Sequence, residues 1–94
     1  MKIEFDADKD EINRFKHRVS LAFAKRFLAD DDTVIVATFR KQDEEERFKA
    51  IGIVEGKLYT AVHVWQGDMA RIISVRRSNA AEQRLYDRDS GRSG

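Results

Sequence analysis

Two adjacent arginines, Arg76 and Arg77, stand where an apolar segment meets a predicted helix in the stretch ARIISVRRSNAAEQRLY, residues 70–86. Arginine presents a planar fork of donors that matches two phosphate oxygens, so this corner could bind an anionic ligand. A solvated strand end, with the arginines paired to Glu82 or Asp87, would explain the same residues. The residue types alone leave both interpretations open.

Other side chains able to hold an anion or transfer a proton are spread along the chain. Lys16 and His17 end the first predicted helix, where cations also complete the helix dipole, and the residues alone favour that simpler interpretation. Glu46 and Arg47 begin a predicted strand, although the acidic run 44–46 is more typical of a solvated loop than of a general base.

An exposed aromatic ring beside arginines would suit RNA, because rings stack on bases while arginines hold phosphates. His63, Trp65 and Arg71 are the candidates for such contacts, with ordinary packing as the favoured alternative for the histidine and the tryptophan. The sequence has no glycine-rich phosphate loop, nucleophile elbow or metal-ligand spacing. Any catalysis would therefore use arginine, lysine, histidine, glutamate and tyrosine, and we expect neither a metal nor a cofactor.

Composition indicates one folded domain with a divided charge. The 94 residues are 41% hydrophobic and 37% charged, and the lack of cysteine excludes disulfides and thiolate metal sites. Residues 1–46 hold 9 Lys+Arg against 12 Asp+Glu, a net charge of −3, while residues 47–94 hold 9 against 5, a net charge of +4. This asymmetry fits either a polyanionic partner or a solvated surface. Because no apolar run approaches about 20 residues and the N-terminus is acidic, we expect a cytoplasmic protein without membrane contact.

The N-terminal elements follow from capping residues and helical spacing. Residues 2–5 alternate as a short edge strand, and Asp8 with Glu11 then forms a capping-box pattern. The helix that follows should turn Ile12, Phe15 and Val19 inward. A second helix should start at Ser20, with these inward side chains: Leu21, Phe23, Ala24, Phe27 and Leu28.

From Thr33 onward the periodicity is that of strands. Strands are expected at residues 33–39, 47–54, 58–65 and 69–77, with a polar loop at 40–45 and turns at Glu55–Gly56 and Gln66–Gly67. Asn79 and Glu82 should cap a short last helix. This order predicts an α+β fold with helices on one face of an antiparallel meander of three to four strands. Residues 1–86 should form the single domain and residues 87–94 a flexible tail.

Strand alternation assigns side chains to faces. On the last strand one face should carry Met69, Arg71, Ile73, Val75 and Arg77, and the other Ala70, Ile72, Ser74 and Arg76. The two arginines should therefore serve different purposes, one as a cation of an active face and the other as a brace to the last helix through Glu82. On the preceding strand, Leu58, Thr60, Val62 and Val64 should face the helices, which leaves His63 and Trp65 on an open face.

Four separated segments resemble motifs of the BrnT-like toxins of bacterial type II toxin–antitoxin systems. The segments are EFDADK (4–9), NRFKHRVS (13–20), ERFKAIG (46–52) and RIISVRRSNAAEQRLY (71–86). They are similar, in the same order, to a family pattern of an aromatic and an Asp followed by Lys, Asn-x-x-Lys-His-Gly-Val-Ser, Glu-Arg-x-x-x-Ile-Gly and Arg-Ile-Ile-Ser-x-Arg. The resemblance covers nearly the whole chain, from Ile3 to Tyr86.

The resemblance implies a RelE-like fold and a metal-independent endoribonuclease that arrests growth by cutting RNA. It also implies an antitoxin with a ribbon-helix-helix DNA-binding region, a complex of two toxins on an antitoxin dimer, and contact with operator DNA only through the antitoxin. By motif position the catalytic residues would be Lys16, His17, Glu46, Arg47, Arg76 and Arg77, with Tyr86 ranked lower. The alternative is a non-catalytic RNA- or protein-binding module that retains the antitoxin contact.

Three positions depart from the family pattern. Arg18 replaces the glycine that ends the first helix, and Gln66 stands in a hairpin where the family often has an arginine before glycine. Phe5 replaces the tryptophan of the first motif. The first change removes the residue best suited to a left-handed backbone.

Overall fold

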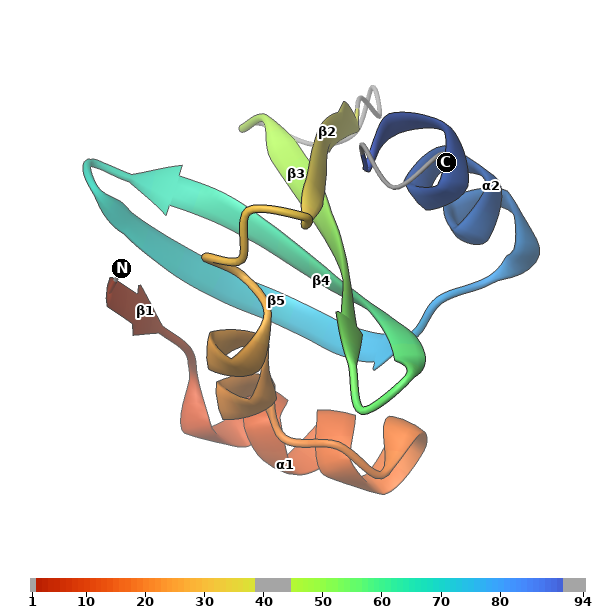
Figure 1. The fold of residues 1–94 in the computed structure, drawn as a ribbon. Coiled ribbons are helices and arrows are strands. Elements are labelled where there is room, and N and C mark those ends of the chain that lie inside the picture. The colour runs from red at the N-terminus through yellow and green to blue at the C-terminus, as the bar shows by residue number, and fades with distance from the viewer. Residues whose placement is uncertain (1, 39–44, 91–94) are drawn as a thin grey trace.

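The computed structural model describes residues 2–38 and 45–90, and these form an α+β fold around one sheet (Figure 1). The elements are β1 (Lys2–Glu4), α1 (Ala7–His17), the 3₁₀ helix η1 (Leu21–Arg26), β2 (Val34–Thr38), β3 (Arg47–Val54), β4 (Lys57–Gln66), β5 (Met69–Arg77) and α2 (Ala80–Asp89). None of the helices within these residues is long and apolar enough to cross a membrane. The predicted α+β class is confirmed.

The sheet has five strands in the order β1-β5-β4-β3-β2. Strands β2 to β5 form the expected antiparallel meander, and the short N-terminal strand pairs with β5 in parallel. The turn between β3 and β4 is the predicted Glu55–Gly56 pair, and both residues have positive φ, 51° and 78°. Two such residues in a two-residue loop suit the right-handed twist of a hairpin. The next turn lies at Gly67–Asp68, one residue later than expected.

Helices cover both faces of the sheet, so the prediction of helices on one face is wrong. Ala50 and Ile51 are consecutive in β3, point to opposite faces and are both fully buried. The side chains of η1 pack with Ala50, whereas Tyr86 of α2 packs with Ile51. A strand that is apolar on both sides needs cover on both sides.

The first helix is held to the fold by a polar residue and not by its apolar ones. Helix α1 begins at Ala7 because Asp6, not Asp8, caps it by accepting backbone N–H donors at 2.8 and 3.1 Å. Ile12 and Phe15 are 55% and 84% exposed, so their predicted inward placement is wrong. Asn13 is buried instead, and its side-chain amide pairs with the backbone of Val75 through both N–H···O bonds, at 2.8 and 3.2 Å. Asn13 thus supplies the hydrogen bonds of a missing edge strand.

The second N-terminal helix is 3₁₀ and not α-helical, although its predicted inner side chains Leu21, Ala24, Phe27 and Leu28 are buried and Phe23 packs against them. Ser20 occupies its N-cap position without a side-chain hydrogen bond. At the other end, the predicted capping box of Asn79 and Glu82 is present. Helix α2 continues through Asp89, three residues beyond Tyr86, and residues 40–44 of the expected loop and 91–94 of the expected tail lie outside the described residues.

A β-bulge in β5 overturns the predicted alternation of that strand. The register shifts so that Val62 pairs with Ser74 whereas His63 pairs with Ile72, which leaves Ile73 as the extra residue. Residues 69–72, on the N-terminal side of the bulge, therefore point to the sheet face opposite to the one that simple alternation predicts. Ala70 and Ile72 join Val75 under η1, and Met69 and Arg71 move to the face of Ser74 and Arg76.

Candidate functional site

Four cations of the central strands point to the sheet face opposite η1, and we call this surface the cationic face. They are Arg47 and Lys49 of β3 and Arg71 and Arg76 of β5. Lys49 pairs with Val62, which pairs in turn with Ser74, so Lys49 and Ser74 are two strand spacings apart, roughly 10 Å.

A buried carboxylate organises two of these cations. Glu82, 1% exposed, accepts hydrogen bonds from both terminal nitrogens of Arg76, each at 2.7 Å, and lies 2.9 Å from Lys49 Nζ. The Thr60 hydroxyl and the Asn79 backbone N–H donate to the same carboxylate at 3.0 and 2.9 Å. The predicted brace through Glu82 is therefore present, and Arg76 is the arginine that forms it. The expected division of roles between the two arginines is wrong, because Arg76 also belongs to the cationic face.

The protonation state of this cluster follows from its contacts. Burial by itself would raise the pKa of Glu82, but the hydrogen bonds from Arg76, Asn79, Lys49 and Thr60 outweigh it and lower that pKa to about 2. The hydrogen bond to Glu82 raises the pKa of Arg76. Two fixed cations against one fixed carboxylate leave the cluster positive, so it can attract an anion.

Lys16 and His17 lie at the edge of the cationic face. They line one hollow together with Ile73 and Ser74, the residues of the β5 bulge. Because Ser74 belongs to the cationic face, the end of α1 extends that face at its β5 side. Both side chains are exposed and can reach a bound ligand.

Glu46 and Arg47 occupy the start of β3. Glu46 is exposed and directly precedes the strand, and Arg47 is its first, half-buried residue. The structure thus brings Arg47, Arg71 and Arg76 onto one face of the sheet, with Lys16 and His17 beside it.

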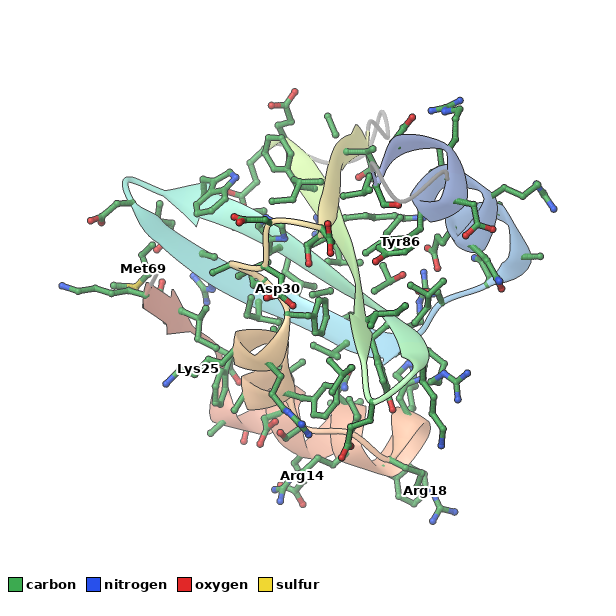
Figure 2. The ribbon with its side chains drawn as sticks, viewed as in Figure 1. Arg14, Arg18, Lys25, Asp30, Met69 and Tyr86 are labelled. Atoms are coloured by element: carbon green, nitrogen blue, oxygen red, sulfur yellow. The ribbon has the colours of Figure 1, made fainter. Side chains whose placement is uncertain are left out.

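Arg77 and Tyr86 lie elsewhere. Arg77 is on the face opposite Arg76, where its guanidinium lies 5.6 Å from the Tyr59 ring centroid and its Nε donates to the Leu58 carbonyl at 3.3 Å. Tyr86 is buried between α2 and the sheet, against Val34 and Ile51 (Figure 2). Arg77 is thus outside the cationic face, whereas Tyr86 lies on the same side of the sheet but is buried beneath α2, away from the four cations.

His63 and Trp65 are on the η1 side, so their predicted open face is the wrong one. His63 is fully buried, with its ring 5.8 Å from Phe48 and 5.2 Å from Trp65 between centroids. Burial lowers the pKa of His63, and within the described residues its Nε2 has no hydrogen-bond partner. Trp65, 36% exposed, is the outer member of this cluster. The prediction failed because η1 covers the strand side that carries Tyr59 and Ala61.

Sequence reasoning overlooked Lys49, although a signal was available. It is the one cation inside the apolar run of β3, and strand alternation puts it on the face of Arg47. Across residues 2–38 and 45–90 there is no cluster of three or more His, Cys, Asp or Glu side chains that could hold a metal ion. The groups present can bind phosphate through cations and move protons through a histidine or a carboxylate.

Comparison with known families decides the assignment. The family model described as the ribonuclease toxin BrnT of type II toxin–antitoxin systems matches residues 5–82 of the 94. The chain belongs to the BrnT family. It is thus a toxin with ribonuclease activity, and a type II system implies an antitoxin partner for it. No curated protein matches this toxin.

Proposed function

We propose that the toxin is an endoribonuclease that cuts RNA without a metal ion, using the cationic face and the adjoining end of α1. The observation that carries this proposal is the juxtaposition of Lys49, Arg71 and Arg76 on one face with Lys16 and His17 at its edge. Positioned cations can stabilise the charge that develops on a phosphate during cleavage, which is the role a metal ion otherwise fills.

The proposed cleavage is attack by a ribose 2′-oxygen on the neighbouring phosphorus. A base removes the 2′-hydroxyl proton, the bond from phosphorus to the 5′-oxygen breaks, and an acid protonates that leaving oxygen. The products are a 2′,3′-cyclic phosphate and a 5′-hydroxyl. We assign the base and the acid of this step to His17 and Glu46, whose side chains are both exposed. Arg47, Arg71 and Lys49 would hold the phosphates.

Glu82 serves in this proposal as a positioning residue. It fixes Arg76 through two hydrogen bonds and Lys49 through a contact of 2.9 Å, so both cations are oriented before RNA binds. A preorganised cation costs less reorganisation during reaction than a mobile one. Because Arg76→Ala would also leave a buried carboxylate short of partners, it confounds folding with activity.

The test uses purified toxin and a single-stranded RNA with EDTA present. His17→Ala and Lys16→Ala, both at exposed positions, should each lower the cleavage rate about 10²-fold or more, since positioned proton-transfer groups and cations contribute on this scale. Lys25→Ala is the matched control, because Lys25 is an exposed cation on η1, away from the cationic face, and its rate should match the wild type.

The products and the substrate sugar distinguish the outcomes. RNA with 2′-O-methyl groups should not be cut, and the fragments should carry cyclic phosphate ends. Cleavage that disappears with EDTA and returns with a divalent cation would contradict the metal-independent proposal. RNA binding without fragments under every condition would favour the alternative of a non-catalytic binding module.

The proposed partner is a ribbon-helix-helix antitoxin that binds operator DNA, in a cytoplasmic complex of two toxins on an antitoxin dimer. A RelE-like arrangement of the toxin is part of the same proposal. Light scattering of the co-purified complex measures its mass, and a mass other than that of two copies of each chain would overturn the stoichiometry. DNA binding by the complex, but not by the toxin alone, is the expected result of a gel-shift assay.

A further inference from the structure

Helix α1 carries two large apolar side chains that the fold does not use. Phe15 is 84% exposed and Ile12 is 55% exposed, and they are three residues apart, so they are neighbours on the helix surface. The helix is attached by Asn13 on its other side. Contiguous exposed apolar side chains mark interaction surfaces when they form a larger patch, so the neighbours of this pair decide its meaning.

This apolar surface continues onto the sheet edge. Ile12 borders the same hollow as Ile73, the half-buried extra residue of the β5 bulge. Phe15, Ile12 and Ile73 therefore form a strip that crosses α1 and ends at the cationic face. We call these three residues the α1 strip.

The surroundings of the α1 strip are basic toward the C-terminal end of α1. Lys9, Lys16 and His17 line the hollow beside Ile12, and a second hollow beside Phe15 is lined by Arg14, Lys16 and Arg18. Figure 2 shows Arg14 and Arg18 directed away from the sheet. Asp8 and Glu11 lie one helical turn before Ile12 and Phe15, and the Asp10 carboxylate lies 3.4 Å from Arg14, so negative groups flank only the N-terminal part of the strip. Residues 12–29 contain no Asp or Glu. An occupant of this surface must offer apolar groups at its centre and negative charge at its rim.

RNA and an acidic peptide are the two candidate occupants. RNA meets only part of this description, whereas the peptide meets all of it. RNA would satisfy the cations and could stack a base on Phe15, but it has no apolar group suited to Ile12 and Ile73. An amphipathic peptide segment offers apolar side chains at helical spacing and carboxylates beside them. Apolar contact together with charge complementarity therefore favours a peptide.

We propose that an acidic amphipathic segment of the antitoxin docks on the α1 strip, with its apolar side on Phe15, Ile12 and Ile73 and its carboxylates against Lys9, Lys16 and Arg18. The consequence for activity rests on the proposed function. Lys16 borders both hollows and His17 borders one, so the docked segment covers the proton-transfer end of the proposed cleavage site. Neutralisation then occurs by direct occlusion.

The test uses calorimetry to measure binding of the cognate antitoxin. Phe15→Glu should raise the dissociation constant at least 30-fold, because it removes an apolar contact and places a carboxylate opposite the acidic segment. The RNA cleavage rate of this variant should equal that of the wild type. Ile35→Glu is the matched control, since Ile35 is an exposed apolar residue (43%) on β2, and its affinity should change less than twofold. Circular dichroism verifies that both variants are folded.

Every other outcome either overturns one of the two proposals or assigns the α1 strip to a different occupant. Unchanged antitoxin affinity in Phe15→Glu, or no binding to the wild type, would overturn the docking proposal. Loss of RNA cleavage with unchanged affinity would assign the α1 strip to RNA. A wild-type toxin that is dimeric by light scattering, beside a monomeric Phe15→Glu variant, would assign the strip to a second copy. A wild-type toxin that binds the antitoxin but cuts no RNA would overturn the proposed function and leave the docking result intact.

Discussion

Glu82 shows how one side chain links the last helix to the candidate site. It closes the capping box of α2 with Asn79 and at the same time fixes Arg76 and Lys49 on the sheet. A carboxylate this buried is stable only when its partners are in place, because an unpaired buried charge is costly. Formation of α2 and orientation of the two cations therefore depend on the same carboxylate.

We predict that Glu82→Gln destabilises the toxin in a pH-dependent way. The folded pKa of about 2 lies below the ordinary 4.5, so the carboxylate stabilises the fold fully above pH 4.5 and loses that effect as the pH falls toward 2. The shift corresponds to about 3 kcal/mol at neutral pH. Urea unfolding should show this difference at pH 7 and less than half of it at pH 3.

The control for this prediction is Glu55→Gln. Glu55 lies 3.6 Å from Arg26, but its side chain is 79% exposed, so the loss should stay below about 1 kcal/mol at either pH. Equal losses for the two variants, or a Glu82→Gln loss that does not depend on pH, would mean that Glu82 is not held as a carboxylate.

Arg18 occupies the left-handed position that ends α1. Its φ of 62° and ψ of 26° strain a residue with a side chain, whereas glycine adopts them freely. We predict that Arg18→Gly stabilises the toxin by about 1 kcal/mol in urea unfolding. Arg14→Gly, in the interior of the same helix, should destabilise it by about 1 kcal/mol. Destabilisation by both would show that the Arg18 side chain contributes more than its backbone costs.

The elements were largely predictable because their signals are local. Strands β3 and β5 have the predicted bounds, and the Asn79–Glu82 capping box follows from two residue types at a fixed spacing. The face assignments failed where a distant contact decided them. The bulge at Ile73 is an insertion into the ladder with no local sequence mark, and it moved Arg71 from the face of Arg77 to that of Arg76.

The N-terminal helix failed for a related reason. Its apolar spacing predicted an inward Ile12 and Phe15, but hydrogen bonds of polar side chains, from Asn13 to Val75 and from the Leu21 backbone N–H to Asp10, hold the helix in another rotation. Pattern reasoning treats apolar side chains as buried, whereas an exposed apolar pair is consistent with a binding surface. The candidate site was therefore predicted at Lys16, His17, Arg47 and Arg76, and missed at Lys49.

We predict that Asn13→Ala releases α1 from the sheet. The substitution leaves the Val75 N–H and C=O without their side-chain partner, and unsatisfied buried groups cost about 1–3 kcal/mol each. Hydrogen exchange should accelerate in α1 and at Val75 while β3 and β4 stay protected. Arg14→Ala is the control at an exposed position of the same helix and should leave exchange unchanged. Uniform acceleration through the whole sheet would show instead that α1 folds only together with it.

Across the whole molecule the sheet separates two surfaces of different character. The η1 side carries an apolar core and the buried His63 beside the exposed Trp65, and the other side carries the cationic face between α1 and α2. The net charge is only +1, but the positive groups are concentrated on one surface. A polyanion should bind this molecule on one side, through a few identifiable cations.

We predict the salt dependence of RNA binding from that distribution. Each phosphate neutralised on a single strand contributes about −0.7 to the slope of log K against log of salt concentration. Removing one contact cation by Arg71→Gln should thus make the slope shallower by about 0.7, and Lys49→Gln should add a similar change. Lys25→Gln, on the η1 side, should leave the slope as it is. Fluorescence anisotropy with a non-cleavable 2′-O-methyl RNA measures all four proteins, and an equal slope for wild type and Arg71→Gln would place the RNA on a surface other than the cationic face.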